Sequence, residues 1–137
     1  MLVACSSPSP VPVAVPDGPA VGCARLHAGL PSSLAGRDAR DVTPASRRTA
    51  AWGSPAVTLR CGVQPPAGLR KDSELVVVDG VGWYLHSEDP PFVFTAVDRV
   101  TYVEVRVPRG VPRSEATAPL ADLAAPIKSA LPPRAAP

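Results

Sequence analysis

The residues able to perform acid–base or nucleophilic chemistry are few and lie far apart in the chain. The two histidines, His27 and His86, belong to no cluster of ligands spaced as in a metal site. A serine hydrolase needs a histidine and an acid beside its nucleophile. Ser54, His86 and Asp98 supply these residue types, but no characteristic spacing links them, and a proline follows Ser54 directly. We therefore expect no catalytic residue, no metal and no cofactor.

The three cysteines offer a more specific kind of chemistry. Cys23 lies on the apolar face of a short predicted helix, and Cys61 lies on the inward face of a predicted strand. A disulfide between them would close a mostly irregular loop and stabilise the fold by roughly 4 kcal/mol. The alternative is two buried free thiols. We predict the disulfide, because a chain with only 4% aromatic residues forms a thin core that benefits from a covalent link.

Cys5 is predicted to carry a lipid. A disulfide implies an oxidising compartment, where an exposed free thiol in a polar segment would be reactive. Leu2-Val3-Ala4-Cys5 matches the bacterial lipobox, in which the cysteine becomes the first residue of the mature, lipidated protein. The alternative is a chance tetrapeptide in a segment rich in Ala and Val. On the lipoprotein interpretation, the rest of a signal peptide lies upstream of Met1.

Charge and hydropathy argue against two classes of protein. The net charge of +2, with no dense block of Lys and Arg, argues against binding to nucleic acid. The sequence contains no apolar run of about 18 residues, the length that crosses a bilayer as a helix. We therefore expect the membrane to be a partner only through the lipid anchor at Cys5.

The first part of the chain predicts a tether, a short helix and a loop. Residues 6–22 are rich in proline, which favours an extended spacer, so residues 1–22 are interpreted as a lipobox remnant and a tether. One face of a short helix follows, at Cys23, Leu26 and Leu30. Residues 35–54 are polar and irregular, which predicts a long surface loop.

The remainder predicts a sheet followed by a helix. Apolar residues alternate in residues 57–63, 92–97 and 100–107, and two further runs flank the turn signal Asp79-Gly80. Short links between these segments predict an antiparallel meander of four to five strands. A helical stripe then occurs at Leu120, Leu123, Ile127 and Leu131. Pro126 predicts that this helix is kinked or starts late.

These elements define a single α+β domain over residues 23–131, with a disordered tail at 132–137. We expect an N-terminal and a C-terminal helix packed on the antiparallel four- to five-stranded meander, with one disulfide.

The outward face of the predicted sheet is the candidate binding face. Its members are Arg60 on the first strand, Tyr102 and Glu104 on the last, and Trp52 just before the first strand. Aromatic and arginine side chains together favour recognition of a partner. The alternative is structural: Arg60 and Glu104 would form an ordinary cross-strand ion pair, and Trp52 would cover the core.

Several motifs in order resemble a known family. They are TAAWGSPAVTLRCG (residues 49–62), VDGVGWYL, FTAVDRVTYVEVRVP and the terminal PLADL…AL. Over about residues 23–131 the chain is similar to the domain-of-unknown-function family numbered thirty-five fifteen, small actinobacterial envelope proteins described as secreted proteins or lipoproteins. The resemblance implies export and an α+β domain, and it implies no known activity.

Together these observations predict an exported, lipid-anchored envelope protein at the outer face of the cell membrane, or outside the cell, if a signal peptide lies upstream. We expect a non-enzymatic binding or scaffolding module whose partner is an envelope protein or polymer. The alternative is a hydrolase that acts on a cell-envelope polymer.

Overall fold

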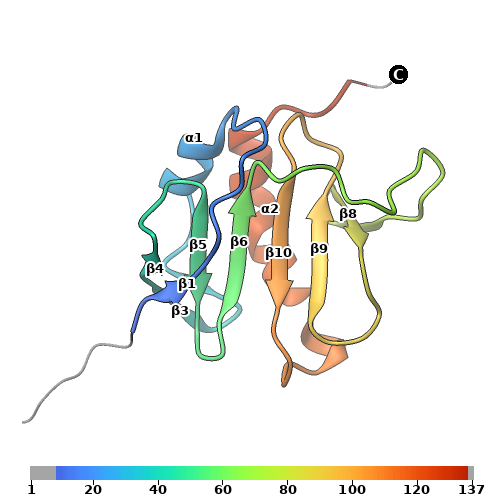
Figure 1. Ribbon diagram of the computed structural model, residues 1–137. Helices are drawn as coiled ribbons and strands as arrows, with labels where there is room; N and C mark the ends of the chain where they lie inside the picture. The colour runs from blue at the N-terminus through green and yellow to red at the C-terminus, as the bar shows by residue number, and fades with distance from the viewer. Residues whose placement is uncertain (1–8, 136–137) are drawn as a thin grey trace, which may run out of the picture.

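One large antiparallel sheet forms the centre of the structure, a computed structural model that describes residues 9–135. Its strands are β2 (Ser33–Leu34), β3 (Arg37–Arg40), β5 (Thr49–Trp52), β6 (Val57–Cys61), β7 (Val76–Val78), β8 (Val81–Leu85), β9 (Phe92–Ala96) and β10 (Val103–Val107). They lie side by side in the order β2-β3-β5-β6-β10-β9-β8-β7 (Figure 1). The predicted α+β class is confirmed, but the predicted four to five strands are wrong, because the sheet has eight.

The three additional strands, β2, β3 and β5, come from a region predicted mainly as a surface loop. Apart from Leu34 and Trp52, their side chains are polar or small, so they show no clear alternation of apolar residues. Pairing with neighbours decides their conformation: β5 joins β6 with Trp52 opposite Val57, and β3 joins β5 with Arg40 opposite Ala51. Strand formation depends strongly on such neighbours, and a sequence pattern does not display them.

The turn between β7 and β8 forms as predicted. Asp79 and Gly80 both have positive φ angles, 49° and 85°. A two-residue hairpin turn of this type requires positive φ at both central positions, which Asp and Gly tolerate best. The predicted hairpin is confirmed.

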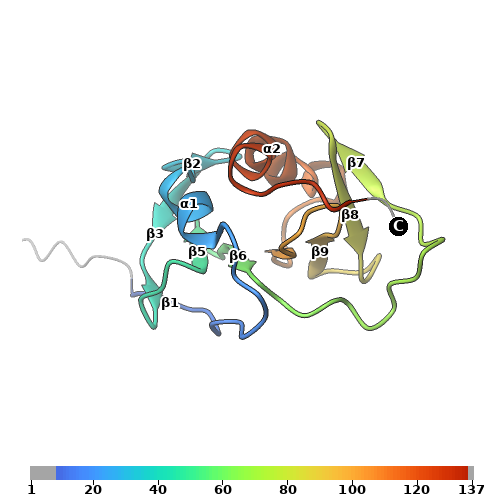
Figure 2. The same ribbon diagram turned by 90° about the horizontal axis from the view of Figure 1, so that it is seen from above.

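Two helices cover the same face of the sheet. Figure 2 shows α1 (Cys23–Ala28) and α2 (Ala118–Ala130) on one side, with the N-terminal segment on the other. A short 3₁₀ turn, η1 (Arg113–Glu115), leads into α2. The predicted stripe of α2 is buried at all four positions, Leu120, Leu123, Ile127 and Leu131. The helix begins at Ala118 and contains Pro126, so the alternative of a late start does not apply.

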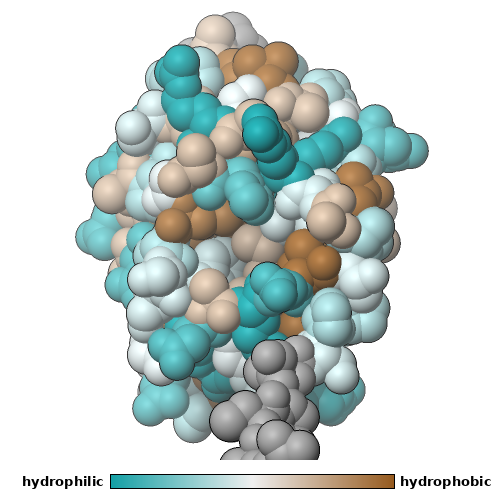
Figure 3. Space-filling model, turned by 90° about the vertical axis from the view of Figure 1, so that its left-hand side faces the viewer, coloured by the Kyte–Doolittle hydropathy of each residue, from teal (hydrophilic) through white to brown (hydrophobic). Residues whose placement is uncertain are grey.

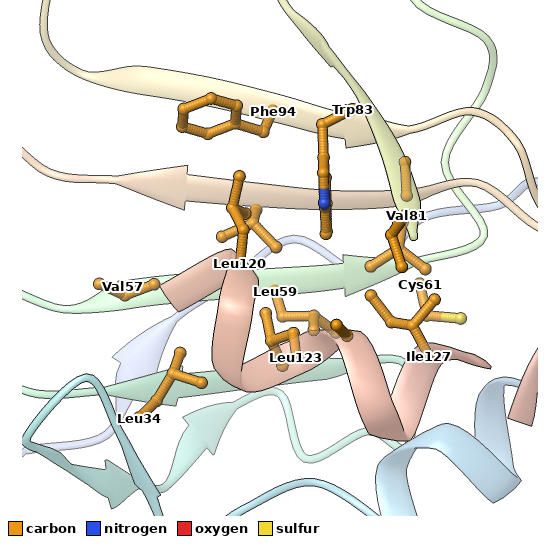
Figure 4. Packing of buried hydrophobic residues seen from close by; sticks show 14 of the residues in the cluster. Leu34, Val57, Leu59, Cys61, Val81, Trp83, Phe94, Leu120, Leu123 and Ile127 are labelled. Carbon is orange, nitrogen blue, oxygen red and sulfur yellow. The ribbon is translucent and has the colours of Figure 1, made fainter. Parts of the chain in front are cut away.

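The core lies between α2 and the inner face of the sheet. In Figure 4, Leu120, Leu123 and Ile127 point from α2 towards the strands, where Leu59, Val81 and Trp83 meet them. Trp83 is fully buried and fills space that the many valines of the sheet leave open. Burial of such side chains stabilises by about 1.5–3 kcal/mol each, and it is the main force that holds the helix on the sheet.

A disulfide joins Cys23 of α1 to Cys61 of β6, with 5.7 Å between the two Cα atoms. The predicted bond is confirmed, and the alternative of two free thiols is excluded. The bond connects the helical layer to a central strand of the sheet, and both cysteines are buried.

The described part of the predicted tether packs against the domain. β1 (Val11–Pro12) pairs in parallel with β4 (Val42–Thr43), and Val13 is only 5% exposed. The segment runs across the outer face of the sheet near β5 and β6 (Figures 1 and 2). Residues 9–22 therefore belong to the packed structure rather than to a free spacer, because side chains of the sheet bind their backbone. The lipobox residues Leu2 to Cys5 lie outside the described residues.

The beginning of the predicted disordered tail is also held in place. The Arg134 backbone N–H donates to the Asp98 carbonyl at 2.8 Å, and the Val100 N–H donates to the Pro132 carbonyl at 3.0 Å. These bonds attach residues 132–134 to the connection between β9 and β10. Within residues 9–135, no helix is both long enough and apolar enough to cross a membrane.

The disulfide generates a prediction about stability. We expect the double variant Cys23→Ala, Cys61→Ala to lose roughly 4 kcal/mol of unfolding free energy, because the unfolded chain regains the freedom of a long loop. Urea titration without reductant measures this loss. Cys5→Ala is the matched control and should leave the midpoint unchanged. Equal midpoints for all three proteins would contradict the structural role of the bond.

Candidate functional site

Arg60 and Glu104 lie on the outward face as predicted, and they bind each other. They are register partners on β6 and β10, and the Arg60 Nη1 atom lies 3.1 Å from Glu104 Oε1. Arg60 Nε also donates to the Ala14 carbonyl at 2.8 Å. Both side chains are half-buried. The pair therefore attaches the N-terminal segment to the sheet, which favours the structural interpretation over a free recognition surface.

Tyr102 lies at the end of this face, and its ring is also in contact with another side chain of the protein. The guanidinium carbon of Arg134 is 4.6 Å from the centre of its ring, a distance typical of a cation–π contact. Its carbonyl accepts the backbone N–H of Gly62 at 2.8 Å. Tyr102 and Arg134 line a small depression of about 260 Å³.

Trp52 does not belong to the outward face, and this part of the prediction is corrected. It is the last residue of β5 and stands opposite Val57, which places its side chain on the inner face. The indole is 1% exposed, and its Nε1–H donates to the Pro31 carbonyl at 2.9 Å. The sequence interpretation missed β5 and therefore grouped Trp52 with the outward face, whereas its alternative, that Trp52 covers the core, agrees with the burial of the side chain.

The structure does not bring Ser54, His86 and Asp98 together. His86 Nε2 lies 2.8 Å from Thr95 Oγ1, and Asp98 accepts the Gly82 N–H at 2.8 Å. Gly82 and His86 lie near opposite ends of β8, about 13 Å apart along an extended strand. Ser54 follows β5, four strands from β8 in the sheet, which corresponds to about 19 Å. Within residues 9–135, no three His, Cys, Asp or Glu side chains gather as metal ligands would.

An open pocket of about 970 Å³ lies at the side of the sheet where β3, β4 and α1 meet. Figure 3 faces this side of the molecule and shows apolar surface among hydrophilic side chains. The lining is mainly apolar, with a minority of polar and charged groups. The apolar members include Leu30, Pro31, Val42, Trp52 and several alanines, and the polar members include His27, Arg40, Asp41, Arg47 and Thr49.

The pocket exists because the chain leaves the sheet after Arg40. The pairing between β3 and β5 ends with Arg40 opposite Ala51. The chain then turns outward, and Val42 pairs with Val11 instead of continuing beside β5. Among the residues that the structure describes, the first residues of β5 thus have no hydrogen-bonded strand on that side, although β4 lies close to β5 without pairing with it. Alanines at 39, 45 and 50 keep the vacated space open.

Two polar atoms at this pocket are buried without a hydrogen-bond partner within residues 9–135: Thr49 Oγ1 and Arg40 Nε. Thr49 is 1% exposed. The terminal nitrogens of Arg40 donate to the Gly53 carbonyl at 2.9 Å and to the Ser9 carbonyl at 2.7 Å, so the guanidinium is held firmly at the wall. Buried polar atoms are nearly always paired in proteins, so these two are suited to a ligand. The sequence analysis named Trp52, His27 and Leu30 of this lining but did not group them, because most of the lining lies in the region predicted as a loop.

Arg48 has a structural role that the sequence interpretation did not assign. Its Nε donates to the Cys61 carbonyl at 3.1 Å, and its Nη2 donates to the carbonyls of Gly18 and Gly62 at 2.8 and 2.9 Å. The side chain therefore joins the N-terminal segment to the end of β6.

We expect Arg48→Met to lose about 2 kcal/mol of stability, since hydrogen bonds from a charged donor contribute about 1.5–3 kcal/mol. Residues 9–22 should also become sensitive to thermolysin, measured by limited proteolysis under native conditions. Arg47→Met is the matched control, because Arg47 is exposed and adjacent. Similar cleavage rates in the two variants would show that Arg48 does not hold the segment.

Comparison with known proteins identifies a family but no activity. No curated protein and no solved structure matches the chain. The model of the family described as "Protein of unknown function (DUF3515)" matches residues 4–136, which is nearly the whole chain. The resemblance found in the sequence motifs is thereby confirmed, and the chain belongs to this family.

Proposed function

We propose that this chain is an exported, lipid-anchored envelope protein that binds a partner in its pocket without catalysing a reaction. The observation that carries the proposal is the Cys23–Cys61 disulfide. Disulfides persist in oxidising compartments and are rare where thiols are kept reduced. A buried structural disulfide therefore supports a location outside the cytoplasm.

The remaining cysteine supports the anchor. Cys5 is the one cysteine outside the bridge, and it ends the lipobox sequence Leu2-Val3-Ala4-Cys5. A thioether-linked diacylglycerol would bury two acyl chains at about 0.8 kcal/mol per CH₂, which exceeds the marginal binding of a single chain. Ser9 and Pro10 lie at the pocket, and four residues from Cys5 span at most about 14 Å. An anchored protein would thus hold its pocket close to the membrane surface.

The geometry of the described residues supports binding over catalysis. A general base must come within about 2.6–3.2 Å of its partner. Ser54 lies four strands from β8, and His86 and Asp98 lie near opposite ends of β8, so the alternative of a hydrolase has no assembled triad to support it. The pocket, in contrast, combines apolar walls with a few polar atoms, which is the usual make-up of a binding site.

Lipidation can be tested directly in cells. Expressed from its own gene in its native host, the wild-type protein should partition into the detergent phase of a Triton X-114 extraction, whereas Cys5→Ser should remain in the aqueous phase. Ser7→Ala serves as a control for substitution in the same segment and should behave as wild type. If wild type and Cys5→Ser partition alike, the protein is not a lipoprotein of this type.

Complementation of a deletion strain tests whether function depends on the pocket or on the Ser54, His86 and Asp98 residues of a hydrolase. We expect Ser54→Ala and His86→Ala to restore any deletion phenotype fully. Ala39→Trp should fail, because an indole at this exposed lining position would fill the pocket without entering the core. Ala121→Trp is the matched control on the exposed side of α2. Loss of function in a stably folded Ser54→Ala or His86→Ala protein would favour the hydrolase instead.

A further inference from the structure

We propose that two copies of this chain associate through β7, so that their sheets join edge to edge into one continuous sheet. The order of strands places β7 at one end of the sheet, where it pairs only with β8 among the described residues. Figure 2 shows β7 beside α2, away from β3 and β5. The surface is separate from the pocket, so the proposal does not depend on the proposed function.

The hydrogen bonds of β8 show which way the backbone of β7 points. Val77 is the register partner of Gly82. The Gly82 N–H donates to Asp98 Oδ2 at 2.8 Å, and its carbonyl accepts the Val97 N–H at 3.1 Å. Val97 and Asp98 follow β9, so both backbone groups of Gly82 point away from β7. Val77 and Gly82 are therefore a pair without mutual hydrogen bonds, and the N–H and C=O of Val77 point past the edge of the sheet.

This edge is accessible to another strand. Val77 is 68% exposed, and Leu75, two residues earlier and hence in the same phase, is 38% exposed. Leu75 Cδ1 lies 3.1 Å from the position that a Cβ on Gly82 would take, which shows that the alternation of side chains continues back to Leu75. Within residues 9–135, no backbone hydrogen bond outside the pairing with β8 reaches Leu75 or Val77.

The two ends of the sheet are protected to different degrees. At the other end, Leu34 of β2 is fully buried, and the next N–H, that of Ala35, donates to Asp122 Oδ2 at 2.7 Å. Proteins commonly protect an exposed edge with a charge, a proline or a bulge. The run Leu75 to Val78 reads Leu-Val-Val-Val and contains neither a charge nor a proline. The edge at β7 is therefore suited to pairing.

An identical strand fits this edge. In an antiparallel pair of copies with the two-fold axis beside Val76, Leu75 lies opposite Val77 of the second copy, and Val77 lies opposite its Leu75. Each of these pairs can exchange both of its N–H···O bonds, which uses the outward donors and acceptors of both copies. Apolar side chains then meet on both faces of the joined sheet, a favourable form of cross-strand contact.

Charges at the two ends of β7 favour this antiparallel arrangement. Glu74 precedes the run of apolar residues, and Lys128 Nζ of α2 lies 3.6 Å from the position that a Cβ on Gly80 would take, after the strand ends. Both side chains are exposed, and neither forms an ion pair within residues 9–135. Within one copy, Glu74 is about 14 Å from Val78 along an extended strand. Antiparallel pairing instead places Glu74 beside Lys128 of the second copy, so the opposite charges are complementary only between copies.

The resulting dimer should be weak and reversible. Pairing through a strand of this length buries less than about 1,200 Å², the range of transient interfaces. We therefore expect a dissociation constant on the order of 100 µM in solution. If Cys5 carries a lipid, confinement of the copies to one membrane raises their effective concentration and favours the dimer.

The test is sedimentation velocity of the full oxidised chain carrying Cys5→Ser, which prevents cross-linking through that thiol, from about 10 µM to about 1 mM, the range that brackets a weak interface. The weight-average sedimentation coefficient should rise from that of a monomer towards that of a dimer. In ¹⁵N spectra over the same range, the amide protons of Leu75 and Val77 should move downfield, and their exchange with solvent should slow by roughly twofold or more.

A matched pair of substitutions locates the interface. Val77→Lys places a charge on the edge and should weaken association by about tenfold or more. Val21→Lys makes the same change at a valine that is 66% exposed elsewhere on the surface, and it should associate as wild type. Val77→Pro removes the outward N–H without removing a bond to β8, a change tolerated at a sheet edge, and it should also weaken association.

A charge exchange tests the antiparallel arrangement. Glu74→Lys should weaken association by about threefold or more at low salt, and adding Lys128→Glu to the same chain should restore it, because the pair of opposite charges forms again between copies. Both residues are exposed, so the fold should be unaffected.

A protein that remains monomeric at about 1 mM, far above the expected dissociation constant, contradicts the proposal and leaves the edge for a different protein. Association that persists unchanged in Val77→Lys and Val77→Pro, or that shifts amides elsewhere and not those of β7, places the interface on another surface and also rejects the proposal. Failure of the charge exchange to restore association rejects the antiparallel pairing of two copies. None of these outcomes bears on the pocket, on Ala39→Trp or on lipidation at Cys5.

Discussion

The disulfide between Cys23 and Cys61 is the constraint on which the arrangement of this protein depends. The helix α1 has six residues, too few to persist alone in water, and no side chain caps its first turn. Packing contributes little more, since only Cys23 and Leu26 of α1 are buried. The covalent bond to a central strand therefore determines where this helix lies. The pocket depends on the bond in turn, because residues at and after the end of α1 form one of its walls.

The sheet is covered differently on its two faces, and the difference follows from composition. The inner face is packed by the apolar stripe of α2, with the two tryptophans supplying bulk that valine and alanine lack. The outer face near β5 and β6 is covered by the chain's own N-terminal segment. That segment buries little apolar surface, so arginines bind its carbonyls: Arg48 at Gly18 and Arg60 at Ala14. If Cys5 carries a lipid, this segment is the mechanical link from the membrane to the sheet.

The pocket forms because the chain after Arg40 pairs with β1 rather than with β5. The chain after Arg40 can continue beside β5 or pair with the N-terminal segment, and it pairs with Val11 and Pro12. This pairing attaches the N-terminal segment to the domain and leaves the first residues of β5 without a paired strand on that side. Proteins usually protect such edges, because exposed N–H and C=O groups attract other strands. Here the edge is protected by burial, because Thr49 and Ala51 are each only 1% exposed and β4 lies close by.

The sequence alone determined the elements that carry strong local patterns. The stripe at Leu120, Leu123, Ile127 and Leu131, the turn at Asp79-Gly80 and the inward phase of Cys23 and Cys61 each follow from periodicity or backbone chemistry within a few residues. Tertiary structure alone decided the strands β2, β3 and β5, the buried position of Trp52, and the attachment of residues 9–22. Those features rest on hydrogen bonds between segments distant in sequence, such as Arg48 to Gly18, and on a pairing partner for each strand. Short, polar or alanine-rich segments become strands only when a neighbour offers its backbone, and one sequence read locally does not contain that neighbour.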